Sequence, residues 1–145
     1  AGLGEPFFDS VESVLSHLVL SIPAIKGIEF GSGFMAAKMK GSEHNDRFVA
    51  ADGKTATNFA GGINGGITNG NDMVFRVPVK PTSSIHRKQN TFNMASGTMT
   101  DLEIEGRHDT CIALRMPVII ESAAAIVLAD FMMQAGLITR IWQFE

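Results

Sequence analysis

Residues 116–133 limit the possible folds more than any other part of the sequence. They are apolar at almost every position, and Pro117 stands where a helix favours proline, because the N–H that proline lacks is not needed in the first turn. A helix that is hydrophobic on nearly all sides must be buried, so we predict a core helix between two layers. Glu121, Ser122 and Asp130 interrupt the run, whereas a membrane span needs about twenty apolar residues. We therefore expect no membrane association.

A second helix is predicted near the start of the chain. Its apolar residues follow the i, i+3, i+4, i+7, i+8 spacing of an amphipathic helix: Val11, Val14, Leu15, Leu18 and Val19. Asp9 and Glu12 have the spacing of a capping box, which makes Asp9 the predicted N-cap. Residues 34–39 predict a further short helix with Gly41 as its C-cap, and residues 41–66 are predicted to be mainly loop.

Short strands are expected between the two longer helices. Residues 73–80 alternate strictly, with Met73, Phe75, Val77 and Val79 on one face, and the hairpin signal Asn69-Gly70 precedes them. Residues 25–30, 91–96 and 98–104 predict further strands, the last two joined around Gly97. Helices combined with mostly antiparallel strands give an α+β fold.

The composition fits one ordinary domain. A length of 145 residues, 45% apolar and 19% charged, is compatible with a single domain over 1–145 and argues against disorder. Cys111 is the only cysteine, so neither an intramolecular disulfide nor a cysteine-based zinc site can form within the chain. We expect a cytoplasmic protein without a metal site, in which Cys111 is a small buried residue.

The charges point to a small anionic ligand. The net charge of −3 argues against nucleic acid, because binding phosphate backbones needs a basic surface. The cationic side chains and histidines instead concentrate in the middle of the chain: Arg76, Lys80, His86, Arg87, Lys88, Arg107, His108 and Arg115.

Residues 80–84 predict a phosphate site. Lys80-Pro81-Thr82-Ser83-Ser84 leaves the alternating strand with a lysine and three hydroxyls, which suit phosphate oxygens. An ordinary exit from a strand into a loop is the alternative interpretation.

Two glycine-containing motifs belong to the same hypothesis. The run Gly61-Gly62-Ile63-Asn64-Gly65-Gly66 permits close backbone approach, although a tightly packed loop would need the same residues. No βαβ unit surrounds it, so it is not a dinucleotide fingerprint. In the turn Gly106-Arg107-His108-Asp109, Arg107 offers a planar fork for anionic oxygens and Asp109 offers a base. A surface ion pair is the alternative for these two residues.

The order and spacing of these motifs, with Ser21-Ile22-Pro23-Ala24-Ile25-Lys26-Gly27 ahead of them, resemble the C-terminal portion of the chorismate synthase family. The resemblance extends over about residues 4–136. It implies a fold in which helices are sandwiched between antiparallel sheets. It also implies a lyase of the shikimate pathway of aromatic amino acid biosynthesis. That enzyme eliminates phosphate from 5-enolpyruvylshikimate 3-phosphate in a 1,4 sense, with reduced FMN, to give chorismate.

The resemblance assigns roles residue by residue. Arg107 would contact flavin and substrate, and Asp109 would assist proton transfer involving the flavin ring. Arg115 either binds substrate or pairs with Glu121, and Thr110 departs from the usual proline, which affects local backbone geometry. The remaining positions would bind flavin: Pro23, Ala24, Gly65, Lys80, Thr82, Ser83 and Ser84.

The resemblance also implies partners and an incomplete chain. The family forms homotetramers, and some members reduce their own flavin with NADPH. Family members are more than twice as long, and their N-terminal Ser-His-Gly motif is absent from this sequence, so we expect a truncated chain that is inactive alone. Two alternatives remain: a noncatalytic module that binds flavin or phosphate, and a structural half-domain that mediates assembly.

Overall fold

The computed structural model describes residues 1–139, so the last six residues of the predicted domain lie outside the described part. The α-helices are α1 (Val11–Ser21), α2 (Gly41–His44) and α3 (Met116–Gln134). Short 3₁₀ turns are η1 (Phe7–Asp9), η2 (Gly33–Lys38) and η3 (Ile112–Arg115). The strands are β1 (Glu29–Phe30), β2 (Ile63–Asn64), β3 (Ile67–Thr68), β4 (Phe75–Arg76), β5 (Gln89–Asn93) and β6 (Thr98–Leu102).

The N-cap of α1 is Ser10, so the prediction of Asp9 as the cap is wrong by one residue. The Ser10 hydroxyl accepts a 3.1 Å hydrogen bond from the Ser13 amide, as an N-cap should. Asp9 instead ends the η1 turn. The start of α1 is fixed from outside the helix, because the Val11 amide donates a 2.9 Å hydrogen bond to the Gly66 carbonyl.

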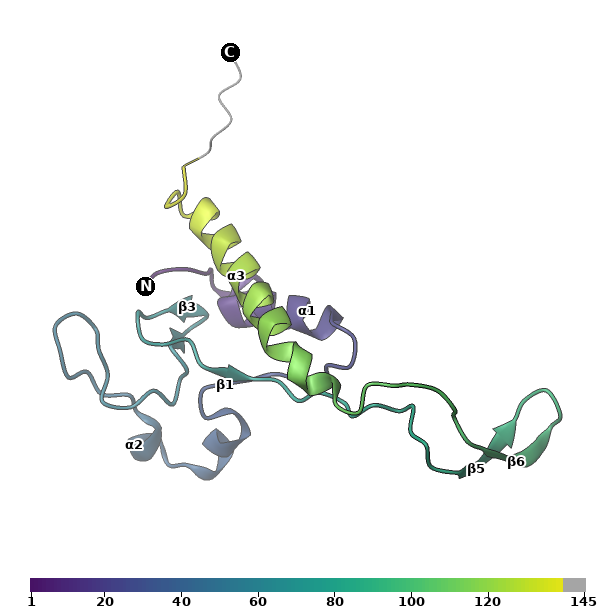
Figure 1. The fold of residues 1–145 in the computed structure, drawn as a ribbon. Coiled ribbons are helices and arrows are strands. Elements are labelled where there is room, and N and C mark those ends of the chain that lie inside the picture. The colour runs from purple at the N-terminus through teal and green to yellow at the C-terminus, as the bar shows by residue number, and fades with distance from the viewer. Residues whose placement is uncertain (140–145) are drawn as a thin grey trace, which may run out of the picture.

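The core lies where α1 and α3 cross. Figure 1 shows α3 running diagonally in front of α1, with β1 and β3 to the left of these helices. The amphipathic pattern of α1 is confirmed, because Val11, Leu15 and Val19 are fully buried. The other buried apolar residues pack against them: Ile25, Ile63, Ala123, Val127 and Phe131.

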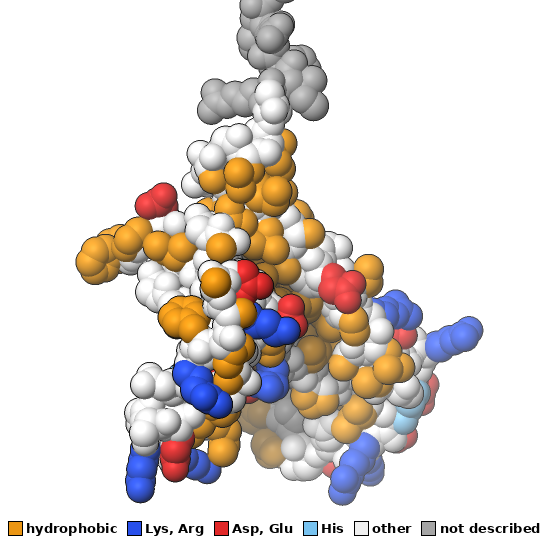
Figure 2. Space-filling view, turned by 90° about the vertical axis from the view of Figure 1, so that its left-hand side faces the viewer, with side chains coloured by type: hydrophobic (Ala, Val, Ile, Leu, Met, Phe, Trp, Pro, Cys, Tyr) orange, Lys and Arg blue, Asp and Glu red, His pale blue; other side chains and the backbone are white. Residues whose placement is uncertain are grey.

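Only one face of α3 is buried among the described residues, so one of the two layers predicted around this helix is present in the described part of the chain. The side chains of Val118, Ile126 and Met133 remain 64%, 62% and 53% exposed. Figure 2 shows hydrophobic side chains at the surface of the upper part of the molecule, toward which α3 runs in Figure 1. The reason is that α1 covers one side of α3 and no second described layer covers the other.

The apolar segment Ile112–Gln134 also meets the length and composition expected of a membrane span. Only 11% of its apolar window is buried. A core helix of a soluble protein has the same composition, so this observation alone is weak evidence for a membrane.

The fold exposes much surface for its size. Its accessible area is 10881 Å², whereas a compact protein of 15.6 kDa exposes about 7,300 Å². The β5–β6 hairpin contributes to the excess because it projects from the body (Figure 1) and all its strand residues are exposed.

The described strands form three antiparallel pairs: β1 with β4, β2 with β3 and β5 with β6. The predicted strands around Gly97 are confirmed as the β5–β6 hairpin. The predicted alternation of residues 73–80 also holds, since Phe75, Val77 and Val79 pack against the core while Arg76, Pro78 and Lys80 are exposed. Regular pairing is shorter than predicted: β4 spans two residues, and Val79 adds an isolated bridge to Ile25.

The hairpin turn near the glycine run is not at Asn69-Gly70. It lies at Gly65-Gly66, between β2 and β3, where both glycines have positive φ angles of 59° and 86°. Two-residue hairpins favour such residues, because their turn types need positive φ. Asn69 instead donates its amide to the Gly62 carbonyl at 2.9 Å.

Residues 41–44 form the short helix α2 and not a loop. The Glu43 carboxylate accepts a 2.9 Å hydrogen bond from the Lys40 amide, which stabilises the first turn. Gly41 is therefore the first residue of α2, and the C-cap of the preceding η2 turn is Met39. Most of residues 45–62 is loop, as predicted.

Candidate functional site

An open cavity of about 320 Å³ brings together two of the predicted segments. Ala24 and Lys26 line one side, Lys80, Pro81, Thr82 and Ser83 line another, and Ile112 completes the wall. Two backbone hydrogen bonds hold the segments side by side, from Lys80 N to Ala24 O at 2.7 Å and from Lys26 N to Pro78 O at 3.2 Å. The structure thus places the exit of the alternating strand against the segment that follows α1.

Ala24 has an unusual backbone conformation at this contact. Its φ is 72°, a region that costs a residue with a side chain about 1–2 kcal/mol. The carbonyl of Ala24 in this conformation accepts the Lys80 amide, so the strained residue orients the two segments. Strained backbone of this kind concentrates at functional sites.

The donors around the cavity suit an anion. Lys26 and Lys80 are exposed, and neither forms an ion pair among the described residues. The backbone N–H groups of Thr82, Ser83 and Ser84 donate no hydrogen bond to any described residue. Ammonium groups and free N–H groups together match phosphate oxygens.

Asp109 is tied to this cavity. The Thr82 hydroxyl donates a 2.9 Å hydrogen bond to the Asp109 carbonyl, and Arg115 Nη2 donates to Asp109 Oδ1 at 3.0 Å. Arg115 therefore pairs with Asp109, and the predicted alternative of a pair with Glu121 is wrong. Arg115 ends η3, directly before α3, where its side chain reaches back to the turn, whereas Glu121 lies further along α3.

Some predicted site residues lie apart from the cavity. Gly65 is exposed in the β2–β3 turn, and Figure 1 shows β3 near the N terminus, far from the β5–β6 arm into which residues 80–84 lead. Pro23 and Ser84 neighbour lining residues without lining the cavity themselves. Arg107 is exposed and forms no ion pair with a described carboxylate.

Two further residues differ from expectation. Cys111 is exposed, so the prediction that it is buried is wrong: it lies in the connection before η3 and not in an element that packs on the core. Lys26 lines the cavity but was not among the predicted site residues. Its signal was available, because it follows Ala24 by two positions in a motif already linked to flavin.

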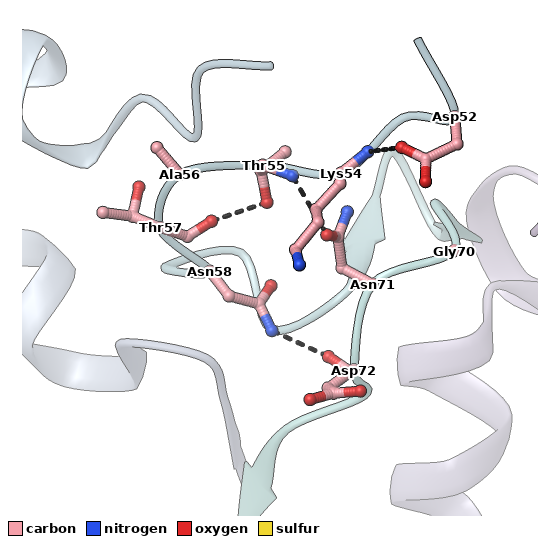
Figure 3. Close-up of a pocket in the computed structure, with 9 residues that line it drawn as sticks. All are labelled: Asp52, Lys54, Thr55, Ala56, Thr57, Asn58, Gly70, Asn71 and Asp72. Atoms are coloured by element: carbon pink, nitrogen blue, oxygen red, sulfur yellow. Dashed lines mark hydrogen bonds between the residues drawn. The ribbon is translucent and has the colours of Figure 1, made fainter. Parts of the chain in front are cut away.

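A larger cavity, of about 460 Å³, lies among the loops around residues 52–58 and 70–72. Figure 3 shows its polar side chains bonded to neighbouring backbone groups. The Asp52 carboxylate accepts from the Lys54 amide at 3.0 Å, and the Asn58 side chain donates to the Asp72 carbonyl at 2.8 Å. One lysine here stands against two carboxylates, so the smaller cavity is the better anion site.

Asp46 organises the loop that leads into the glycine run. Its carboxylate accepts hydrogen bonds from the amides of Phe59 and Ala60 and from the Thr57 hydroxyl, each at 2.8 Å. Burial opposes ionisation of Asp46, but these bonds and the nearby His44 outweigh it and lower the pKa of Asp46 below its usual value. The His44 ring in turn is 2.8 Å from the Ser32 hydroxyl, which joins α2 to η2.

Comparison with known proteins identifies the family to which the chain belongs. The family model described as chorismate synthase matches residues 1–133. The chain belongs to the chorismate synthase family. The fold class is confirmed by a solved structure titled "Crystal Structure of Chorismate Synthase", which has a TM-score of 0.70 and 30% identity. That match covers 92% of this chain and 34% of the solved chain.

Curated chorismate synthases match over almost the whole chain. The protein from Chitinophaga pinensis is 62% identical over 142 residues, which are 98% of this chain and 43% of that protein. The protein from Archaeoglobus fulgidus is 49% identical over 142 residues, 97% of this chain and 39% of its own length. The chain thus spans about two-fifths of the length of these relatives.

Proposed function

We propose that this chain supplies the phosphate-binding part of the flavin site of a chorismate synthase, together with an acid–base group. One observation carries the proposal: Ala24, Lys80, Thr82 and Ser83 line a single cavity, and Thr82 joins that cavity to Asp109. We propose the reaction from membership of the family, and the position of the flavin site from the cavity.

The residues around the cavity fit the phosphate of FMN. Lys26 and Lys80 bring two positive charges to one opening. The Ser83 hydroxyl and the free N–H groups of Thr82 and Ser83 add uncharged donors, and Ser84 lies next to the lining residues. We expect the phosphate of reduced FMN to bind at this opening, with Arg107 reaching the ligands from the turn that contains Asp109.

The proposed reaction is the 1,4-elimination of phosphate from 5-enolpyruvylshikimate 3-phosphate to give chorismate. Reduced flavin supplies electron density transiently while a C–O and a C–H bond of the substrate break. The residues of this chain act on charge and on protons. Lys26, Lys80 and Arg107 offset the repulsion between two phosphorylated molecules held close together. Asp109 holds or transfers a proton through Oδ2, because Arg115 occupies Oδ1.

The exposed face of α3 favours a second role in assembly. Val118, Ile126 and Met133 are apolar and more than half exposed, and exposed apolar patches are typical of interaction sites. We propose a homotetramer, as in the family, that works in the cytoplasm. In a purely structural half-domain the same face would mediate self-association without any ligand binding.

An anaerobic titration tests the main proposal. Reduced FMN is added to the purified chain with and without 5-enolpyruvylshikimate 3-phosphate, and absorbance and chorismate are followed. We expect binding without product. The same titration is then made on a fusion of this chain to the part of the C. pinensis relative that it does not match, hereafter the assembled enzyme.

We expect the assembled enzyme to form chorismate. Flavin binding without elimination by the assembled enzyme would favour a noncatalytic module. Concentration-dependent self-association with no flavin binding in either protein would favour the structural half-domain. Turnover by the 145-residue chain alone would contradict the expectation that the remaining part is needed.

A further inference from the structure

Asp109 is held at two different atoms by two different elements. The Thr82 hydroxyl binds its backbone carbonyl at 2.9 Å, and the Arg115 guanidinium binds Oδ1 of its carboxylate at 3.0 Å. We propose that Thr82 and Arg115 are positioning residues that together fix the direction of the free Oδ2 of Asp109. This inference rests on the proposed function, in which Asp109 transfers a proton.

The hydroxyl of Thr82 has a hydrogen-bond partner in Asp109, which distinguishes it from the hydroxyls of Ser83 and Ser84. A hydroxyl carries one proton, and that of Thr82 is donated to the Asp109 carbonyl. A phosphate monoester near pH 7 presents almost only acceptor oxygens, so in this arrangement the Thr82 hydroxyl does not serve the phosphate. The phosphate is left to Lys80, the serine hydroxyls and the backbone N–H groups.

The backbone of Arg115 is held in place by the helical elements on either side of it. Arg115 is the last residue of η3 and the residue before α3, so its backbone is fixed by a helix that packs on the core. The side chains of Arg115 and Asp109 are 73% and 46% exposed. An exposed ion pair contributes only about 0–1 kcal/mol to stability. The pair is therefore too weak to matter for folding, and its consequence is the orientation of the carboxylate.

The two contacts also link the ligand to the base. Thr82 belongs to the segment that lines the anion cavity, so any shift of that segment moves the Asp109 backbone through the shared hydrogen bond. The hydroxyl itself is donated to Asp109 and not to the phosphate. Its loss should therefore lower turnover and leave flavin affinity almost unchanged.

The test uses the assembled enzyme and separates kcat from KM and from the Kd of reduced FMN. Thr82→Val removes the hydroxyl at nearly constant shape, Thr82→Ser retains it, and Ser83→Ala is the matched control in the same loop. We expect Thr82→Val to lower kcat about 10- to 100-fold, with the Kd of FMN changed less than about threefold. Thr82→Ser should restore most of the rate. Ser83→Ala should instead weaken FMN binding.

Arg115 and Asp109 complete the series. Arg115→Gln should lower kcat about 10- to 100-fold at nearly constant KM, with partial recovery in Arg115→Lys. The double variant Thr82→Val with Arg115→Gln should fall no lower than Asp109→Ala, for which we expect a loss of about 10²–10⁴-fold. A Thr82→Val enzyme with normal kcat and weakened FMN binding, or an Arg115→Gln enzyme with normal kcat, would overturn the positioning role. Full turnover by Asp109→Ala would instead overturn the proposed function.

Discussion

The amide of Val11, at the start of α1, donates a 2.9 Å hydrogen bond to the carbonyl of Gly66 in the β2–β3 turn. The first N–H groups of a helix have no partner inside the helix, so this bond satisfies one of them from a distant segment. Gly66 has a φ of 86°, and a Cβ there would lie 2.5 Å from Cβ of Ser10. The contact thus depends on the absence of a side chain.

We expect Gly66→Ala to lower the free energy of unfolding by about 2–5 kcal/mol, from backbone strain and overpacking together. Gly65→Ala is the matched control, because Gly65 also has positive φ but a Cβ added there would meet nothing within 4 Å. Gly65→Ala should lower the free energy of unfolding by about 1–2 kcal/mol. Urea unfolding of both variants and the unsubstituted chain measures the two losses. Equal losses would show that the approach of Gly66 to Ser10 does not constrain the fold.

The N-cap of α1 gives a second prediction. Ser10→Ala should cost about 1 kcal/mol, because the Ser13 amide loses its acceptor. Asp9→Ala should cost about 0.5 kcal/mol or less, since Asp9 ends the η1 turn and caps nothing. Chemical denaturation of both variants decides between the two positions. A larger loss for Asp9→Ala would return the cap to the position that the capping-box spacing indicates.

Asp46 should make stability depend on pH. Burial disfavours its charged form, but hydrogen bonds from the loop and the nearby His44 outweigh burial and lower its folded pKa below 3.8. Its stabilising contribution is therefore complete above the unfolded pKa and is lost as the pH falls through the folded pKa. We expect Asp46→Asn to cost about 1.5–3 kcal/mol near pH 7, and the difference should shrink below about pH 4.

Glu12 provides a control of opposite sign. Partial burial raises the pKa of Glu12 above 4.5, so its carboxylate destabilises the folded chain once the pH exceeds the unfolded pKa. Glu12→Gln should be slightly stabilising near pH 7, and that gain should vanish in acid. Unfolding curves between pH 3 and pH 7, about the range in which carboxyl groups titrate, measure both variants. A constant difference across this range would contradict either assignment.

Lys80 at the anion cavity and Arg107 in the turn that contains Asp109 should determine flavin affinity. In the assembled enzyme, Lys80→Ala and Arg107→Ala should each weaken binding of reduced FMN about 10- to 150-fold, which corresponds to about 1.5–3 kcal/mol per lost charge-assisted bond. Lys54→Ala is the control, because Lys54 lines the cavity around residues 52–58 and 70–72 and not the anion cavity. Affinity is measured by anaerobic fluorescence titration. An effect of Lys54→Ala as large as that of Lys80→Ala would mean that general charge, and not this cavity, attracts the ligand.

Local sequence patterns predicted which helices and strands form better than they predicted the residues at which these begin and end. The periodic apolar residues of α1 predicted its buried face, and the alternation of residues 73–80 predicted which side chains meet the core. Both patterns reflect geometry within one element. The predictions for the N-cap at Ser10 and for the turn at Gly65-Gly66 are wrong. These two places are joined by the bond from the Val11 amide to the Gly66 carbonyl, a contact between segments far apart in sequence that no local pattern shows.

The candidate site shows the same division. The lysine, hydroxyls and glycines of its motifs could be found in the sequence, and so could the resemblance to the family that they carry. The distances between these motifs in space could not be found in the sequence. Lys26 was overlooked and Gly65 was grouped with residues that the fold separates from it, because only the pairing of residues 24–26 with 78–80 decides which motifs share a cavity.

The sequence by itself determined the family, the α+β class and the two apolar helices, because periodicity and motif order are properties of the chain alone. The tertiary structure decided that Arg115 pairs with Asp109 and that Thr82 donates to the Asp109 carbonyl. It also decided which face of α3 is covered. The Thr82 bond and the covering of α3 depend on contacts between segments far apart in sequence, and the Arg115–Asp109 pair depends on how the chain turns before α3. At each contact, a shift of a few ångströms replaces one hydrogen-bond partner with another.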